Sequence, residues 1–293
     1  MLNAVSVRFP HIGINVNDLI RSFNIFGFEV PVYGVLVVLG IVAGMGLVIF
    51  EARRTWQDVD GYINMGICII LMGIIGGRLF HVIFMWDYYS HNLLQIFNIH
   101  NGGLSMYGGI IAAVITGIVF AAIKKISFLK MADTACLGLV LGQAIAGWGG
   151  FFGREAFGTY TDSLFAMQIK YDEVKGVMNQ KILDHLIRYG GELYIQVHPV
   201  FLYESLWCFI LFAVIMVCKR FKKFDGEVFI WYIAGYSIGK VWTEYFKADR
   251  FMIPGIGIPP VMVLASVIAL VSVVFCLIKH IMAVRADKTE AVK

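Results

Sequence analysis

The sequence contains few charged residues: only 15% of its 293 positions are Asp, Glu, Lys or Arg, whereas 59% are hydrophobic. A soluble globular chain carries about 25% charged and about 45–50% apolar residues. One soluble core cannot bury this excess of apolar side chains. A disordered chain is also excluded, because low hydrophobicity is what keeps such chains unfolded. The composition therefore indicates a polytopic membrane protein.

Signals for metal, disulfide and nucleic-acid chemistry are missing as well. The five cysteines lie in or beside apolar runs and form no CxxC or Cys/His pattern, so neither a disulfide framework nor a zinc site is expected. The formal net charge is only +4, and no basic stripe interleaves with aromatic residues. We therefore expect no metal, no other cofactor and no nucleic-acid partner.

Seven apolar stretches are candidates for membrane spans, since a bilayer core of about 30 Å needs about 20 apolar residues in a helix. The stretch before the first one lacks the compact apolar region of a cleavable signal. The predicted fold is all-α, a polytopic membrane protein whose residues 1–293 form a single membrane domain. The predicted spans are Val30–Phe50, Gly61–Trp86, Ser105–Ile123, Ala135–Phe152, Phe201–Cys218, Val228–Trp242 and Pro260–Ile278.

Basic residues between the spans predict the orientation of the chain, because loops rich in Lys and Arg stay cytoplasmic. Such residues follow the first, third, fifth and seventh spans, whereas the connection 87–101 contains neither Lys nor Arg. The N-terminus is therefore expected outside and the C-terminus in the cytoplasm. The long connection 154–199 is predicted to form an extracytoplasmic cap between spans 4 and 5.

With this orientation, the unusual polar residues are all expected at the outer ends of the spans. Ionisable groups within a membrane are costly and mark either function or structural pairing. The pattern predicts a polar site at the outer leaflet, walled by apolar helices. Its candidate residues are Tyr33, Arg78, Tyr107, Arg154, Glu155, His198, Tyr203, Glu204, Glu244 and Lys247.

These candidates also have structural interpretations, and both kinds remain open at this point. One structural interpretation of Arg78 and Glu204 is a buried ion pair without a role in function. The glycines in 102–109 can let helices pack closely. The tyrosines are typical of the aromatic belt at a membrane surface. Lys247 can snorkel to the head groups, and His198 can form a hydrogen bond at a helix entrance.

Taken together, the polar segments resemble the prolipoprotein diacylglyceryl transferase family. Tyr33-Gly34 looks like the entrance of the family's first span. The longer motifs that carry the resemblance are Gly76-Gly-Arg-Leu-Phe80, Gly102-Gly-Leu-Ser-Met-Tyr-Gly-Gly109, Gly153-Arg-Glu-Ala-Phe-Gly158, His198-Pro-Val-Phe-Leu-Tyr-Glu204 and Glu244-Tyr-Phe-Lys-Ala-Asp249. They follow one another in the order of the family's motifs.

The resemblance implies a seven-helix enzyme of the bacterial cytoplasmic (inner) membrane. It implies transfer of the diacylglyceryl group of phosphatidylglycerol to the thiol of the lipobox cysteine of a preprolipoprotein, the first step of lipoprotein maturation. The implied partners are phosphatidylglycerol, the lipobox segment and membrane lipids, with no cofactor. Tyr107 and His198 are the implied catalytic residues, as candidate acceptors of the thiol proton. The implied substrate-binding residues are Tyr33, Arg78, Gly108, Gly147, Arg154, Glu155, Tyr203, Glu204, Glu244 and Lys247.

The fourth-span motif departs from the family pattern GRWGNFFNREAFG. In the segment Ala146–Gly158, glycine occupies three positions at which the family has an arginine and two asparagines, namely Gly147, Gly150 and Gly153. The resemblance assigns the arginine at the first of these positions to the lipid phosphate. Its loss removes a charge-assisted contact of the kind that binds phosphate most strongly.

Two further departures concern the charged and proton-accepting groups. Lys247 replaces an arginine, which keeps the charge but loses the bidentate fork, and Tyr107 replaces a histidine found in many members. We expect Arg78, Arg154 or Lys247 to compensate for the missing arginine. A second hypothesis stays open, that the chain keeps the fold but only binds lipid or lipoprotein. A small-molecule transporter and another outer-leaflet lipid transferase are further alternatives.

Overall fold

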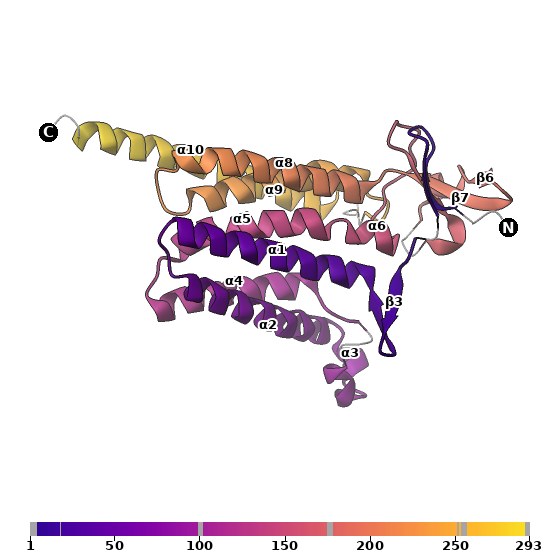
Figure 1. The fold of residues 1–293 in the computed structure, drawn as a ribbon, viewed down its shortest axis with the longest axis horizontal. Helices are drawn as coiled ribbons and strands as arrows, with labels where there is room; N and C mark the ends of the chain where they lie inside the picture. The colour runs from indigo at the N-terminus through magenta and orange to yellow at the C-terminus, as the bar shows by residue number, and fades with distance from the viewer. Residues whose placement is uncertain are drawn as a thin grey trace. The chain divides into compact units, whose positions relative to one another are not determined.

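The computed structural model describes residues 5–17, 19–98, 102–174, 178–250, 252 and 257–290, and most of these residues are helical (Figure 1). Among them, six helical segments are long and apolar enough to cross a membrane, which confirms a polytopic membrane protein. The helix α9 is less apolar than these six because Lys240 and Glu244 lie within it. The long helices are α1 (Val32–Arg54), α2 (Val59–Phe84), α4 (Met106–Lys124), α5 (Phe128–Ala146), α8 (Val200–Cys218), α9 (Glu227–Phe246) and α10 (Pro260–Glu290).

Helix α5 begins seven residues before the predicted fourth span, which was placed at Ala135. Its first turns contain Lys130 and Asp133, and these charged residues lower the hydropathy there, so an apolar run begins only at Ala135. The helix stops at Ala146 and the chain continues as α6 (Gly149–Gly153). The other short helical segments are α3 (Trp86–Tyr89), η1 (Leu93–Phe97), η2 (Tyr171–Glu173), α7 (Gln180–Leu183) and η3 (Lys219–Phe221).

The expectation of an all-α fold is wrong, because the structure contains a five-stranded antiparallel sheet. The sheet joins the N-terminal segment to the connection before α8, in the order β2-β1-β5-β7-β6, and Val7 lies opposite Ile169. These strands have only three to six residues, so their alternation of apolar and polar residues is too short to predict them from the sequence. The strands are β1 (Val5–Phe9), β2 (Ile14–Asn17), β5 (Met167–Lys170), β6 (Ile187–Tyr189) and β7 (Glu192–Val197).

The sheet has a hydrophobic core of its own on the side that faces the helices. Val7, Ile169 and Ile195 are each at most 1% exposed, and they pack with Phe157 and Phe201. Phe201 belongs to the first turn of α8, so this core fixes the start of that helix against the sheet. Burying one such side chain contributes about 1.5–3 kcal/mol.

Two further strands, β3 (Ser22–Ile25) and β4 (Phe28–Pro31), form a separate hairpin directly before α1. The backbone N–H of Val32, the first residue of α1, donates to the carbonyl of Arg21, just before β3, at 2.8 Å. Both ends of the hairpin are therefore attached to the start of the helix.

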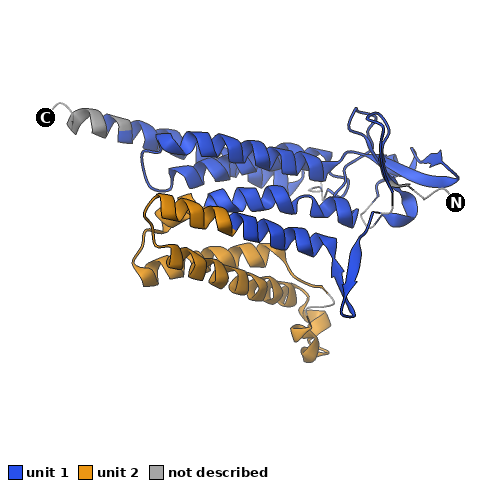
Figure 2. Cartoon of the chain, in the orientation of Figure 1, with its two compact units in different colours: residues 1–44, 136–293 blue, residues 45–135 orange. Residues whose placement is uncertain are grey.

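The chain divides into two compact units, coloured separately in Figure 2: residues 1–44 with 136–293, and residues 45–135. In the first unit, α1 and α5 approach so closely that a Cβ atom built on Gly44 would lie 2.5 Å from the carbonyl oxygen of Gly138. In the second unit, a Cβ atom on Gly76 of α2 would lie 2.3 Å from that of Ala112 on α4. Small residues allow this approach in membranes.

We expect Gly44→Ala to destabilise the contact between α1 and α5, because the new methyl group meets a backbone carbonyl that cannot move alone. Overpacking of this kind costs about 1–3 kcal/mol. Thermal unfolding of the purified protein in detergent should show a lower midpoint. Gly46→Ala is the matched control, since a Cβ atom at Gly46 meets nothing within 4 Å. Equal midpoints for the two variants would contradict the close packing.

Candidate functional site

Four side chains from α8, from α9 and from the residue after α9 form a charged cluster: Glu204, Lys240, Glu244 and Lys247. The Nζ atom of Lys240 lies 2.8 Å from Oε1 of Glu204, and Nζ of Lys247 lies 3.8 Å from the same oxygen. Lys247 also pairs with Oε2 of Glu244 at 3.1 Å. Lys240 and Glu244 are four residues apart in α9, which brings them to one face of the helix. Lys247 follows directly after the end of the helix, where the backbone is extended.

The charged cluster is largely removed from solvent. The side chains of Lys240 and Glu204 are each 25% exposed, and that of Glu244 is 10% exposed. Partly buried charges are tolerated when they are paired, and these four sum to zero.

Lys240 belongs to this site, although the sequence analysis missed it. It lies inside the predicted span Val228–Trp242, and the apolar residues around it give this segment the hydropathy of a membrane span. A signal was available: a lysine in an apolar helix is costly, and this one precedes Glu244 by four residues and Lys247 by seven.

His198 is held by contacts with two aromatic side chains. Its Nδ1 lies 3.2 Å from the hydroxyl oxygen of Tyr203, and its ring packs on that of Phe246 with centroids 4.6 Å apart. Burial, helped by the charge of Lys181, lowers the pKa of His198 below its ordinary value. The imidazole is therefore neutral at pH 7 and able to accept a proton.

The segment that follows α6 closes on the same region through its backbone. The N–H of Gly158 donates to the carbonyl of His198 at 2.8 Å, and the N–H of Thr159 donates to the carbonyl of Phe246 at 2.7 Å. A Cβ atom on Gly158 would lie 2.4 Å from that Phe246 oxygen. The glycine that ends the fourth-span motif is thus required for the close approach.

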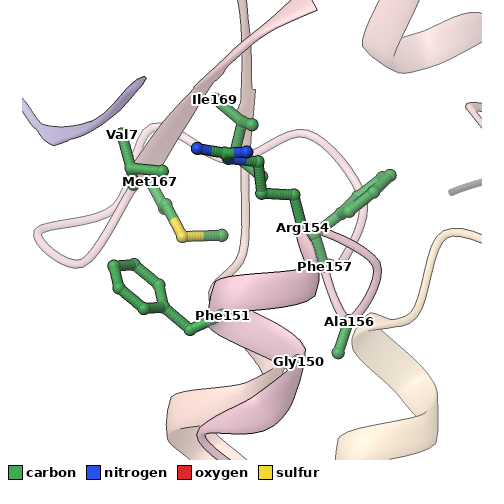
Figure 3. Close-up of a pocket in the computed structure, with 8 residues that line it drawn as sticks. All are labelled: Val7, Gly150, Phe151, Arg154, Ala156, Phe157, Met167 and Ile169. Carbon is green, nitrogen blue, oxygen red and sulfur yellow. The ribbon is translucent and has the colours of Figure 1, made fainter. Parts of the chain in front are cut away.

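Arg154 points into the sheet and its core. It is 4% exposed, donates from Nη2 to the carbonyl of Leu19 at 2.9 Å and pairs with Glu173 at 2.9 Å. Burial lowers the pKa of Arg154, and Glu173 opposes the shift. Figure 3 shows its side chain at a small pocket. The pocket is lined by Arg154 with Val7, Gly150, Phe151, Ala156, Phe157, Met167 and Ile169.

The other candidates of the first unit lie around α6. The ring of Tyr33 packs against Gly149, since a Cβ atom built on this glycine would lie 2.4 Å from Cδ2 of the tyrosine. The rest of the Tyr33 side chain is exposed. Glu155 is exposed just after α6. A Cβ atom on Gly147 would lie 3.4 Å from that of Ser205 on α8. Of the predicted set, the structure joins Glu204, Glu244 and Lys247 in the charged cluster, and it places His198 against Tyr203.

In the second unit, all five N–H groups of the Arg78 guanidinium donate to backbone carbonyl groups. Its guanidinium makes five hydrogen bonds of 2.6–2.9 Å to carbonyl oxygens. The suggested ion pair with Glu204 is wrong: that carboxylate pairs with lysines, and Arg78 is saturated by carbonyl groups. No donor is left to compensate for a missing phosphate ligand. The carbonyls belong to Gln95, Ile96, Asn98, Gly102 and Gly103.

Arg78 holds the segment that leads into α4. Gly102 and Gly103 both have φ of +80°, and a Cβ atom on Gly103 would lie 2.5 Å from Nη1 of Arg78. Tyr107 follows in the first turn of α4 and is 57% exposed. The backbone of Gly108 contacts α2, since its Cβ atom would lie 2.3 Å from that of Phe80. The structural interpretation of this glycine, close helix packing, is confirmed.

The structure also contains buried ionisable groups that are not among the predicted site residues. Glu227 is fully buried at the start of α9 and contacts His280 of α10. Glu51 and Asp133 are 5% and 6% exposed, near the end of α1 and the start of α5. Residues near the ends of helices can be covered by neighbouring segments of the chain, and the hydropathy of the sequence does not show this burial.

The fourth-span glycines differ in the space around them, and this predicts different effects of restoring the family's asparagines. A Cβ atom on Gly150 would lie 2.5 Å from that of Ala156, whereas one on Gly153 meets only the Glu155 side chain at 3.6–3.8 Å. We expect Gly150→Asn to destabilise the folded state by about 1–3 kcal/mol and so to lower the midpoint of thermal unfolding. Gly153→Asn should leave the midpoint unchanged. Adding Ala156→Gly should recover part of the loss. Equal midpoints for the two asparagine variants would contradict the packing.

Comparison with known proteins identifies the family. Residues 21–282 match the family described as prolipoprotein diacylglyceryl transferase. A phosphatidylglycerol–prolipoprotein diacylglyceryl transferase of Clostridioides difficile (strain 630) is 36% identical over 267 residues, 91% of this chain and 96% of the relative. Proteins of the same name from Bacillus mycoides (strain KBAB4) and Bacillus anthracis are 36% and 34% identical over 261 residues, 89% of this chain and 92% of each relative. These matches confirm the resemblance, and the chain belongs to the prolipoprotein diacylglyceryl transferase family.

Proposed function

We propose that this chain transfers the diacylglyceryl group of phosphatidylglycerol to the lipobox cysteine of preprolipoproteins, the first step of lipoprotein maturation. The cysteine sulfur forms a bond to the terminal glycerol carbon of the diacylglyceryl group, and the bond from that carbon to the phosphate oxygen breaks. Glycerol phosphate leaves with the electron pair, and the thiol proton passes to a base. The observation that carries the proposal is the charged cluster in a chain of this family, together with His198, whose ring contacts Phe246, the residue before Lys247.

The charged cluster provides the stabilisation of the leaving phosphate. Lys240 and Lys247 both contact Glu204, so a phosphate that displaces this carboxylate meets two ammonium groups at once. Preorganised donors of this kind act most strongly in a site that excludes water. In this proposal the two lysines replace the arginine that the family pattern places at Gly147. Arg154 serves the cap instead, because its guanidinium binds Leu19 and Glu173.

His198 accepts the thiol proton in this proposal. With the ring proton on Nδ1, donated to the hydroxyl oxygen of Tyr203, the lone pair on Nε2 is available to a substrate thiol. The thiolate is the nucleophile, so removal of this proton is necessary. Tyr107 is the second candidate base, and it is supported by the resemblance alone. Tyr33, Gly108 and Glu155 stay substrate-binding candidates on the same ground.

The topology of the proposal has seven spans in the bacterial cytoplasmic membrane. Helix α9 is added to the six apolar helical segments as the sixth span in chain order, and the pairing of Lys240 with Glu204 lowers the cost of this lysine in lipid. The N-terminus lies outside and the C-terminus in the cytoplasm, as the basic loops indicate. Residues 154–199 then form the extracytoplasmic cap of a single membrane domain, and the sheet with its apolar core supports this assignment.

The test incubates the purified full-length protein with phosphatidylglycerol labelled in its acyl chains and a lipobox peptide. We expect label on the peptide cysteine and release of glycerol phosphate. A peptide with serine in place of that cysteine is the control and should stay unlabelled. Binding of lipid or peptide without transfer would overturn the proposal in favour of the binding-only alternative, which the names of the relatives do not favour.

A further inference from the structure

The β3–β4 hairpin has one apolar and one polar face. Directly opposed residues of an antiparallel pair point to the same side, and side chains alternate along each strand. Phe23 pairs with Val30 and Ile25 with Phe28, so these four apolar side chains share a face. Asn24 pairs with Glu29, on the other face, where the Ser22 hydroxyl donates to the Glu29 carboxylate.

Most of the hairpin is exposed in the described part of the protein, and only Ser22 and Val30 are half-buried. Phe28 is 71% exposed, and Phe26, at the turn, is 99% exposed. Phe26 also has φ of +48°, a region that bulky residues rarely occupy. A hairpin of two strands is only marginally stable in water by itself, and this one belongs to a sheet separate from the five-stranded one. An apolar environment that covers one face is therefore expected.

The place of the hairpin identifies that environment. It ends at Pro31, the residue before α1, and the hydrogen bond from Val32 to Arg21 fixes it to the start of this helix. Figure 1 shows the hairpin running across the axis of α1 instead of along it. Because α1 is long and apolar enough to span a membrane, a segment that leaves its end sideways follows the membrane surface.

We propose that the β3–β4 hairpin places its apolar face and Phe26 in the interfacial layer of the lipid bilayer beside α1. Aromatic side chains are favoured in this layer, and an amphipathic element there buries its apolar face while its polar face meets water and head groups. Glu29, Ser22 and Asn24 form that polar face. The inference depends on α1 as a membrane span and is independent of the transferase reaction.

The experiment reads the depth of single positions. An environment-sensitive fluorescent amino acid is introduced by codon suppression at Phe26, at Phe28 or at Asn24 of the full-length protein in vesicles of phosphatidylethanolamine and phosphatidylglycerol. Fluorescence is quenched either by lipids with brominated acyl chains or by iodide in the water. Asn24 is the control for the opposite face of the same hairpin. Arg188, an exposed residue of strand β6, is the control in a second hairpin.

We expect brominated lipids to quench positions 26 and 28 several-fold more than positions 24 and 188, and iodide to give the reverse order. Equal quenching at positions 28 and 24, or iodide access at 26 equal to that at 188, would overturn the proposal. Protection of position 26 from both quenchers would also overturn it, because a protein surface, such as a second copy, would then cover the hairpin. Val30 reports the same face if a probe at Phe28 prevents folding.

Discussion

Replacing Lys240 with methionine should lower the rate of diacylglyceryl transfer by roughly 10²–10³-fold, the loss typical of removing one preorganised donor from a developing anion. Methionine keeps the length of the side chain but not the charge, so Glu204 would keep only the ammonium group of Lys247, at 3.8 Å. Transfer of labelled lipid to a lipobox peptide measures the effect. Lys240→Arg should keep most of the activity, because it retains the cation.

A double variant separates a phosphate ligand from a partner that only neutralises Glu204. If neutralisation is the whole role of Lys240, then Glu204→Gln together with Lys240→Met removes both charges and restores activity as well as stability. If Lys240 binds phosphate, the double variant regains thermal stability but stays as slow as Lys240→Met. Lys222→Met is the matched control, because Lys222 pairs with Asp225 in the loop before α9, outside the charged cluster. Recovery of activity in the double variant would assign Lys240 a structural role.

Replacing His198 with glutamine should slow transfer by roughly 10²–10⁴-fold, the contribution typical of a positioned general base. Glutamine keeps hydrogen-bonding capacity beside Tyr203 but accepts no proton from a thiol. His185→Gln is the matched control, since His185 is an exposed residue between α7 and β6 that stacks on Tyr160. Unchanged turnover in His198→Gln would transfer the role of base to another residue, with Tyr107 the first candidate.

The pH profile tests the same assignment independently. A base must be unprotonated, and burial lowers the pKa of His198, so kcat/KM should be lost only as the pH falls below the ordinary histidine value of about 6.5. A tyrosine base would instead place the rise of activity near its ordinary pKa of about 10. Stability should change in the same direction as activity: below about pH 6.5 the unfolded chain binds the proton more readily, so the folded state is destabilised as the pH falls.

Most of the membrane architecture was predictable because hydropathy and helix length are local properties. Six predicted spans correspond to helical segments of sufficient length and apolarity, and their boundaries shift chiefly where polar residues such as Lys130 occupy a helix end. The sheet was not predictable in this way. Val7 pairs with Ile169, and the energy of such a strand pair depends on residues far apart in the chain.

The candidate site shows the same division. His198, Tyr203, Glu204, Glu244 and Lys247 could be selected because polar groups at the ends of apolar spans are costly and the motifs resemble one family. The partners of these groups could not be selected. Glu204 pairs with Lys240, a residue hidden in an apolar run, and Arg78 binds five carbonyl oxygens instead of a carboxylate.

Composition and motif order by themselves determined that this chain is a membrane protein of one particular family, because both depend on residue types and their spacing. Tertiary structure alone decided which cation faces which anion, which glycine is a contact between helices, and where Arg154 points. Those outcomes depend on distances between segments such as α6 and the sheet, and the free energy of an ion pair or a packed backbone changes within a few ångströms. No local pattern contains that information.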